Sequence, residues 1–167
     1  MVGKTSILEN LNRLETLYNA STTSGKKSLF YSKLAILELC GWIEESMDDI
    51  VRKCANRKLK EAGNQEHIES VIKYTYGFTY DKHFRKMLIE LIGLINVERL
   101  EMRIDRVKFQ NMKSTLGLLR QFRDTEAHTH LKGITRALDA PSATINKFFK
   151  VYEGLKEFEN KLNRLSF

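Results

Sequence analysis

An all-α fold, a bundle of four to five helices in a single domain spanning residues 1–167, is what the sequence predicts. The chain holds only one proline, Pro141, and because proline disrupts helix interiors, its scarcity permits long helices. Apolar residues recur at intervals of three and four along most of the chain, which is the spacing of one helix face. A hydrophobic fraction of 42% over 167 residues is enough for a buried core.

The first two helices have the clearest patterns. A helix over residues 6–18 carries four side chains on one face and is followed by a Ser- and Thr-rich loop over residues 21–25. A long helix over residues 27–60 has apolar side chains at a spacing of 4-3-4-3-4. Gly41 lies inside this helix, and its conformational cost predicts close packing there. The inward residues are Ile7, Leu11, Leu14 and Tyr18, then Ile36, Cys40, Ile43, Met47, Ile50 and Cys54.

The middle of the chain is less regular. Residues 62–80 are ambiguous, and their pattern permits a short helix over residues 66–74. A third helix is predicted over residues 80–95, and a fourth begins near Val107. Only short β signals compete, as at residues 103–107. The inward residues are Phe84, Met87, Leu88, Leu91 and Ile95, then Phe109, Met112, Leu116, Leu119 and Phe122.

The last helix has start signals of its own. Asp139 is a suitable N-cap residue, and Pro141 suits the first helical turn. The helix then presents one apolar face, made by Ile145, Phe148, Phe149, Tyr152, Leu155, Leu162 and Leu165.

Composition also bears on partners and location. The net charge of +7 favours a polyanionic partner such as RNA or DNA without establishing one. Cys40 and Cys54 share the apolar face of the long helix, which predicts buried thiols rather than a disulfide or a metal site. No apolar run approaches the roughly 20 residues of a membrane helix, and the first residues lack a signal-peptide core. We therefore expect a cytoplasmic protein with no membrane, metal or cofactor.

One segment stands apart from the helical pattern. The fourth helix runs into Arg123-Asp124-Thr125-Glu126-Ala127-His128, and a second histidine follows at His130. This resembles the signature of the HEPN family, which is an arginine, a polar residue and, after four to six residues, a histidine. His128 gives a gap of four residues from Arg123 and His130 a gap of six. The order of helices also resembles that family, with the motif late in the chain and one helix after it.

The resemblance implies a function. It implies a metal-independent RNA endonuclease of toxin or antiviral-defence type, without cofactors, that leaves a 2′,3′-cyclic phosphate. It also implies a homodimer that pairs two motifs in one cleft, and a cognate antitoxin or defence-system partner. In family toxins with a nucleotidyltransferase antitoxin, a tyrosine follows two residues after the histidine. Here that position holds His130, which puts such control in doubt.

The residue types suit this chemistry. A guanidinium such as that of Arg123 holds phosphate in two hydrogen bonds, and a histidine near neutral pKa transfers protons. In a continuous helix, Arg123 and His128 lie roughly 140° apart, whereas Arg123 and His130 lie within about 20°. If the helix frays or kinks after Ala127, His128 can approach Arg123. We expect Arg123 and His128 to be the essential pair, with Asp124 in a positioning role and His130 accessory. If the helix continues, the six-residue gap to His130 is the working one instead.

Other interpretations stay open. The alternative function is a non-catalytic HEPN-type module that binds RNA, nucleotide or a protein partner, and a third is a helical interaction domain with a chance motif. If the motif arose by chance, Arg123 and Glu126 are a surface ion pair, and the histidines cap a helix end. Possible RNA-backbone contacts come from Arg52, Lys53, Arg57, Lys58 and Arg120, although a solvated helix end also explains most of them. Four aromatic residues at 74, 76, 78 and 80 suit core packing or base stacking, and we assign no role to His67 or His83.

Overall fold

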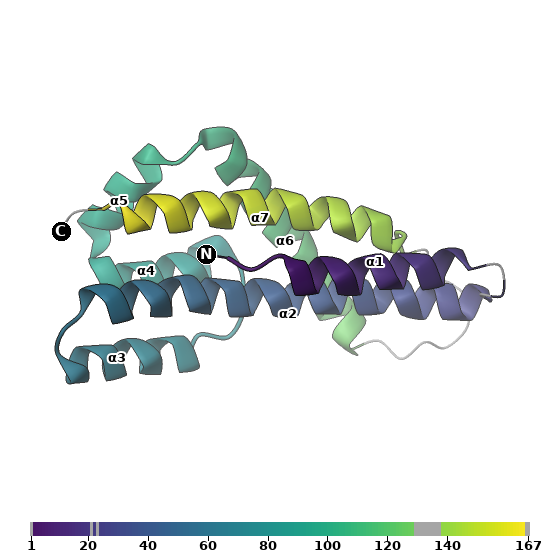
Figure 1. Cartoon of the computed structure of the whole chain (residues 1–167), viewed down its shortest axis with the longest axis horizontal. Coiled ribbons are helices and arrows are strands. Elements are labelled where there is room, and N and C mark those ends of the chain that lie inside the picture. The colour runs from purple at the N-terminus through teal and green to yellow at the C-terminus, as the bar shows by residue number, and fades with distance from the viewer. Residues whose placement is uncertain (1, 21, 23, 129–137, 166–167) are drawn as a thin grey trace.

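The computed structural model describes residues 2–20, 22, 24–128 and 138–165, with the backbone alone at residues 125–128. Within these residues the chain forms seven α-helices, a π-helical turn called η1, and no β-strand. The all-α prediction is confirmed, and the helices outnumber the expected four to five. In order they are α1 (Thr5–Asn19), α2 (Gly25–Lys58), α3 (Ala62–Lys73), η1 (Tyr80–Phe84), α4 (Arg85–Ile92), α5 (Leu94–Arg103), α6 (Arg106–His128) and α7 (Pro141–Asn163) (Figure 1).

The hydrophobic core receives buried side chains from every described helix and from η1. α1 packs along α2 and α7, and α6 packs against α7 and α2 (Figure 1). The 34 residues of α2 span about 50 Å. No helix in the described part of the chain, α2 included, combines the length and apolarity needed to cross a bilayer. The predicted seam of α2 is confirmed, because Ile36, Cys40, Ile43, Met47, Ile50 and Cys54 are all buried.

α7 and α6 approach each other closely at Gly154 of α7. A Cβ atom on Gly154 would lie 2.5 Å from Cβ of Met112, so a larger residue does not fit there without movement. The prediction of close packing at Gly41 was wrong. Gly41 is exposed, and no atom lies within 4 Å of the place its Cβ would take. The conformational cost of a helical glycine does not reveal which face of the helix it occupies.

The predicted helix over residues 80–95 is interrupted at Gly93. Gly93 has a φ of +77°, which side-chain-bearing residues rarely adopt, and α4 ends there while α5 begins. The prediction that Ile95 points inward was therefore wrong, and its side chain is 67% exposed. Phe149 of α7 was also wrongly predicted to be inward and is exposed. The short β signal at residues 103–107 covers the end of α5, the two-residue connection at 104–105 and the start of α6.

A side chain of α1 accepts a hydrogen bond from the backbone at the start of α7. Pro141 is its first residue, as predicted, but the N-cap is Ala140 and not Asp139. The backbone N–H of Ser142 donates to Oε2 of Glu15 in α1 at 2.7 Å. This carboxylate pairs one of the N–H groups that a helix start leaves without an intrahelical acceptor.

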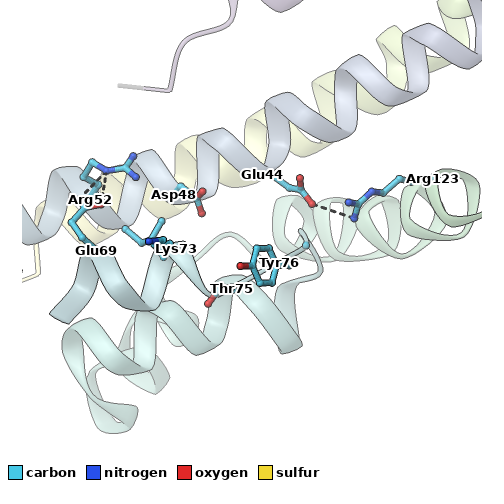
Figure 2. Close-up of a pocket in the computed structure, with 10 residues that line it drawn as sticks. Glu44, Asp48, Arg52, Glu69, Lys73, Thr75, Tyr76 and Arg123 are labelled. Carbon is cyan, nitrogen blue, oxygen red and sulfur yellow. Dashed lines mark hydrogen bonds and ion pairs between the residues drawn. The ribbon is translucent and has the colours of Figure 1, made fainter. Parts of the chain in front are cut away.

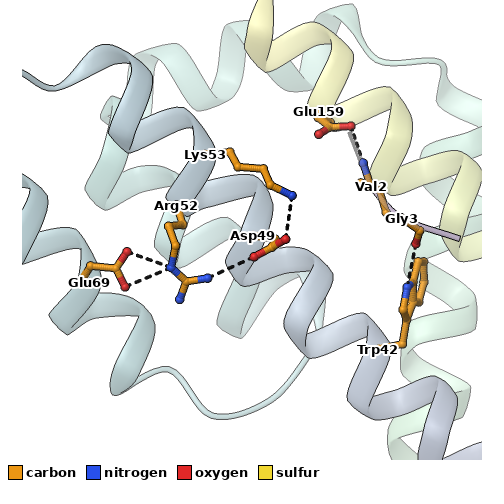
Figure 3. Close-up of polar contacts among 8 residues, drawn as sticks. All are labelled: Val2, Gly3, Trp42, Asp49, Arg52, Lys53, Glu69 and Glu159. Carbon is orange, nitrogen blue, oxygen red and sulfur yellow. Dashed lines mark hydrogen bonds and ion pairs between the residues drawn. The ribbon is translucent and has the colours of Figure 1, made fainter. Parts of the chain in front are cut away.

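The first residues are fixed to the bundle by two hydrogen bonds. The backbone N–H of Val2 donates to the buried carboxylate of Glu159 in α7 at 2.9 Å. The indole N–H of Trp42 in α2 donates to the carbonyl of Gly3, also at 2.9 Å (Figure 3). The start of the chain thus links α2 to α7.

Candidate functional site

The site forms where the segment between α3 and α4 passes the C-terminal part of α6. In this segment Tyr74 and Tyr76 are exposed, whereas Phe78 and Tyr80 are buried. The segment ends in η1, where the backbone N–H of His83 and that of Phe84 both donate to the carbonyl of Thr79, at 3.2 and 3.3 Å. A π-helical turn of this kind occurs often at functional sites.

Arg123 of α6 points at this segment and at α2. Its Nη1 atom lies 3.2 Å from Oε1 of Glu44 in α2, and its Cζ atom lies 5.8 Å from the ring centre of buried Phe78. Oε1 of Glu44 is itself buried and has no hydrogen-bond partner among the described residues. The contact with Arg123 is therefore an attraction between charges without the alignment of a hydrogen bond, so the guanidinium keeps capacity for a second anion.

A pocket of about 440 Å³, which we name the α2–α3 pocket, has Arg123 in its wall. Figure 2 shows an ion pair at each end, Arg123 with Glu44 and Arg52 with Glu69, and Tyr76 near the first pair. Three acidic and three basic side chains line this pocket, so their formal charges balance. The lining consists of Glu44, Asp48, Arg52, Glu69, Ile72, Lys73, Thr75, Tyr76, Gly77 and Arg123.

One carboxyl group of the α2–α3 pocket has an unusual pKa. Partial burial raises the pKa of Asp48 to about 6, from an ordinary value of 3.8. Arg52 lowers this pKa, while the neighbouring carboxylates, first that of Glu44, raise it further. Asp48 therefore exchanges a proton near physiological pH, which is the range that suits an acid or base in catalysis.

A second, smaller pocket adjoins the first. We name this cavity of about 180 Å³ the His83 pocket. It shares Tyr76, Gly77 and Arg123 with the α2–α3 pocket, so Arg123 stands between the two. Its described lining carries two guanidinium groups against one carboxylate, a cationic excess that the α2–α3 pocket lacks. The lining consists of Tyr76, Gly77, Phe78, Thr79, His83, Arg120, Arg123 and Asp124.

The structure brings together part of the predicted motif. Arg120, Arg123 and Asp124 all line the His83 pocket, and the carboxylate of Asp124 lies 3.6 Å from Nε of Arg120. α6 is continuous from Arg123 through His128, so the helix does not end after Ala127. The side chain of His128 and the whole of His130 lie outside the described residues.

The predicted RNA-binding residues of α2 have partners within the protein. Arg52 donates to Glu69 at 2.9 Å and contacts Asp49, and Lys53 contacts Asp49 at 2.7 Å (Figure 3). Arg57 donates to the side chain of Asn163 at 2.6 Å, and Lys58 donates to the carbonyl of Leu165. Of these four residues, Arg52 lines the α2–α3 pocket and so is grouped with Arg123.

Sequence reasoning missed His83 and Asp48. His83 has no partner at ligand spacing in the sequence, since Arg120 and Arg123 are more than thirty-five residues away. Asp48 stood on the charged face of a long helix, which ordinarily faces solvent. Gly77 has a positive φ of +121° in the structure, but a single glycine in the sequence does not reveal this conformation or its contact with His83.

Comparisons with known proteins add no relative. No protein-family model matches the chain, and neither the curated proteins nor the solved structures yield a match.

Among the described residues, no group of three or more His, Cys, Asp or Glu side chains is arranged to hold a metal ion. Cys40 and Cys54 are buried and free, and burial raises the pKa of both thiols.

Proposed function

We propose that this chain is a metal-independent RNA endonuclease whose site is organised around Arg123. The observation that carries the proposal is the position of this guanidinium in the wall between two adjoining pockets. A phosphodiester at Arg123 has space beside it for adjoining parts of the RNA chain. The guanidinium holds the phosphate and stabilises charge on the phosphorane, while the 2′-hydroxyl of RNA supplies the nucleophile.

The exposed aromatic residue at the pocket supports a single-stranded substrate. Tyr76 lines both pockets and is 78% exposed, so its ring is accessible to an unpaired base. Stacking on an aromatic ring is tolerant of sequence, because every base has a π face. Double-stranded RNA keeps its bases stacked inside the helix, and we expect it to be a poor substrate.

We propose a homodimer as the active form, with His128 as the proton-transferring residue. Five residues along a continuous helix correspond to roughly 140° around its axis, so Arg123 and His128 occupy different sides of α6. Two antiparallel copies of α6 allow the arginine of one chain to meet the histidine of the other. A toxin or antiviral-defence role, with a cognate partner protein, follows only from the resemblance of the motif to HEPN proteins.

The proposal is tested by RNA cleavage in the presence of EDTA. Wild-type protein is expected to cut single-stranded RNA and to leave a 2′,3′-cyclic phosphate and a 5′-hydroxyl end. RNA with 2′-O-methyl groups should resist, because the nucleophile is blocked. Arg123→Ala should abolish cleavage, and Arg123→Lys should fail largely, since lysine lacks the planar fork. Arg99→Ala is the matched control, because Arg99 is exposed on α5 and lines neither pocket.

A second function, a non-catalytic module that binds RNA or nucleotide, is favoured by one observation. The guanidinium of Arg123 already has Glu44 as an anionic neighbour at 3.2 Å, as in a structural ion pair. For this function, wild-type protein binds labelled RNA with an affinity that falls with salt but leaves every molecule uncut. Binding that depends on Arg123 without any cleavage would establish the module and exclude the nuclease.

A further inference from the structure

We infer that the His83 pocket binds one phosphate group of the RNA backbone, with His83 as a hydrogen-bond donor beside Arg120 and Arg123. The inference deepens the proposed function and rests on RNA as the substrate. It assigns a role to a histidine that does not belong to the Arg-His motif. It also places the phosphate on the cationic side of Arg123, away from the carboxylates of the α2–α3 pocket.

Thr79, the residue that precedes η1, holds the ring of His83 in one orientation. The backbone N–H of Thr79 donates to Nδ1 of His83 at 3.0 Å, and the Thr79 hydroxyl lies 2.8 Å from the same nitrogen. With Nδ1 accepting the backbone N–H, the neutral ring carries its proton on Nε2. The turn therefore fixes both the tautomer and the direction of the remaining N–H group.

Gly77 makes room for that orientation. A Cβ atom on Gly77 would lie 2.7 Å from Nε2 of His83 and 2.8 Å from Cε1. The φ of +121° at Gly77 is in addition a conformation that side-chain-bearing residues rarely adopt. The Nε2 edge of the ring therefore lies close to Gly77, and both residues line the His83 pocket.

Charge identifies the ligand as an anion. The described lining offers the guanidinium groups of Arg120 and Arg123 together with the N–H of His83, against the single carboxylate of Asp124. Asp124 is already near Arg120, at 3.6 Å. Guanidinium groups bind phosphate through paired, charge-assisted hydrogen bonds, and a tetrahedral anion has enough oxygens for three such donors.

Burial is the main reason that the ring of His83 favours the neutral form when the pocket is empty. Burial lowers the pKa of His83, and the positive charge of Arg120 in α6 lowers it further. Glu44 from α2 opposes this change, while Lys82 in η1 adds to it. A neutral ring donates one proton from Nε2, and a bound phosphate raises the pKa again because opposite charges attract.

Two readouts test the inference, namely ¹H–¹⁵N NMR of the histidine rings with inorganic phosphate, and cleavage of a short single-stranded oligoribonucleotide. Phosphate is expected to shift the ring signals of His83 and not those of His67, which is exposed on α3. Chloride at equal ionic strength is expected to leave His83 unshifted. Arg120→Ala should weaken the phosphate effect at least about tenfold.

Two variants distinguish the role of the Nε2 donor of His83 from the role of its hydrogen bond with Thr79. His83→Asn keeps an acceptor for the Thr79 N–H and removes the Nε2 donor, so it should fold, lose phosphate binding and cut RNA at least about tenfold more slowly. His83→Gln carries its amide donor one carbon further out, closer to the place of Nε2, and should retain more phosphate binding than His83→Asn. His67→Gln is the matched control and should cut RNA at the wild-type rate.

The outcomes distinguish the two proposals. If wild-type protein cuts RNA while His83→Asn cuts equally well and phosphate leaves the ring signals unmoved, the His83 pocket does not bind the substrate. If wild-type protein never cuts RNA but phosphate shifts His83, the nuclease proposal fails and the anion site stands. If phosphate shifts His83 and His67 alike, binding is nonspecific and the inference is overturned.

Discussion

Arg123 of α6 and Glu44 of α2 form an ion pair at 3.2 Å in which the buried carboxylate oxygen lacks a hydrogen bond from any described residue. The pair joins two helices that are distant in sequence. It places a negative charge beside the guanidinium that we propose binds phosphate. A polyanion approaching Arg123 must therefore overcome the repulsion of Glu44.

We expect Glu44→Gln to tighten RNA binding, because it removes this repulsion and keeps the shape of the side chain. Fluorescence anisotropy of a labelled oligoribonucleotide at constant salt measures the change. Glu45→Gln is the matched control, since Glu45 is the exposed neighbour in α2 and does not line the α2–α3 pocket. Equal gains in both variants would show that only net charge matters, and weaker binding by Glu44→Gln would contradict the prediction.

Asp48 should make the fold less stable as the pH rises. Its pKa is about 6 in the folded protein and 3.8 ordinarily, so the folded state holds the proton more tightly. Stability from this group is therefore greatest below about pH 4, falls between about pH 4 and 6, and stays low above that range. Asp48→Asn removes the cost of the buried charge and should raise the free energy of unfolding at pH 7.5 by about 1–2 kcal/mol, after allowance for partial exposure.

Urea unfolding at pH 4.5 and pH 7.5 checks this prediction. The difference between the two pH values should shrink in Asp48→Asn and persist in Glu45→Gln. A pH dependence unchanged by Asp48→Asn would mean that another group is responsible.

Gly154 and Gly41 should respond to alanine in opposite ways. Gly154→Ala forces a Cβ atom to 2.5 Å from Met112 and should destabilise the protein by about 1–3 kcal/mol. Gly41→Ala meets no neighbouring atom and should stabilise its helix by about 0.5–1 kcal/mol. Thermal or urea unfolding of both variants gives the comparison, and a neutral Gly154→Ala would show that α6 and α7 can separate without cost.

Tyr76 should contribute to RNA binding and not to stability. Its ring is 78% exposed, so Tyr76→Ala should change the free energy of unfolding by less than about 0.5 kcal/mol. The loss of one stacking platform should weaken binding of single-stranded RNA by about 1–3 kcal/mol. Tyr74→Ala is the matched control, because Tyr74 is also exposed but lines neither pocket. Equal losses in the two variants would argue against a specific stacking site.

The sequence predicted those parts of the fold that depend on local periodicity. The seam of α2 from Ile36 to Cys54 is buried as expected, because a spacing of three and four residues leaves only one face for the core. The break at Gly93 was missed because apolar residues continue on both sides of it, as at Ile92 and Leu94. A single glycine costs only about 1 kcal/mol in a helix, so tertiary packing decides whether the helix continues.

The candidate site was predictable in part. Arg123, Arg120 and Asp124 lie on one helix, and their shared location follows from spacings of three and four residues. The contact of Arg52 with Asp49 is also local, at a spacing of three, whereas its contact with Glu69 depends on the packing of α3 on α2. The grouping of His83 with the arginines depends on the path of a loop, and no local pattern encodes that path.

The last prediction concerns the number of chains in the site. α6 is continuous through His128, and the two motif residues are roughly 140° apart around a regular helix. If the cleft is shared by two copies, an Arg123→Ala chain still supplies His128 and a His128→Ala chain still supplies Arg123. Each variant alone should cut RNA at least about 10²-fold more slowly than wild type. A mixture of the two should recover part of the wild-type rate, because only mixed dimers hold one functional arginine and one functional histidine.

Differently tagged chains and light scattering show whether mixed dimers form. The control mixture pairs His128→Ala with the Arg123→Ala/His128→Ala double variant, which supplies no functional histidine and should recover nothing. If mixed dimers form but the rate does not recover, Arg123 and His128 do not act across the dimer. If wild-type protein is monomeric at micromolar concentration and fully active, the site is complete within one chain, and His83 becomes the histidine that accompanies Arg123.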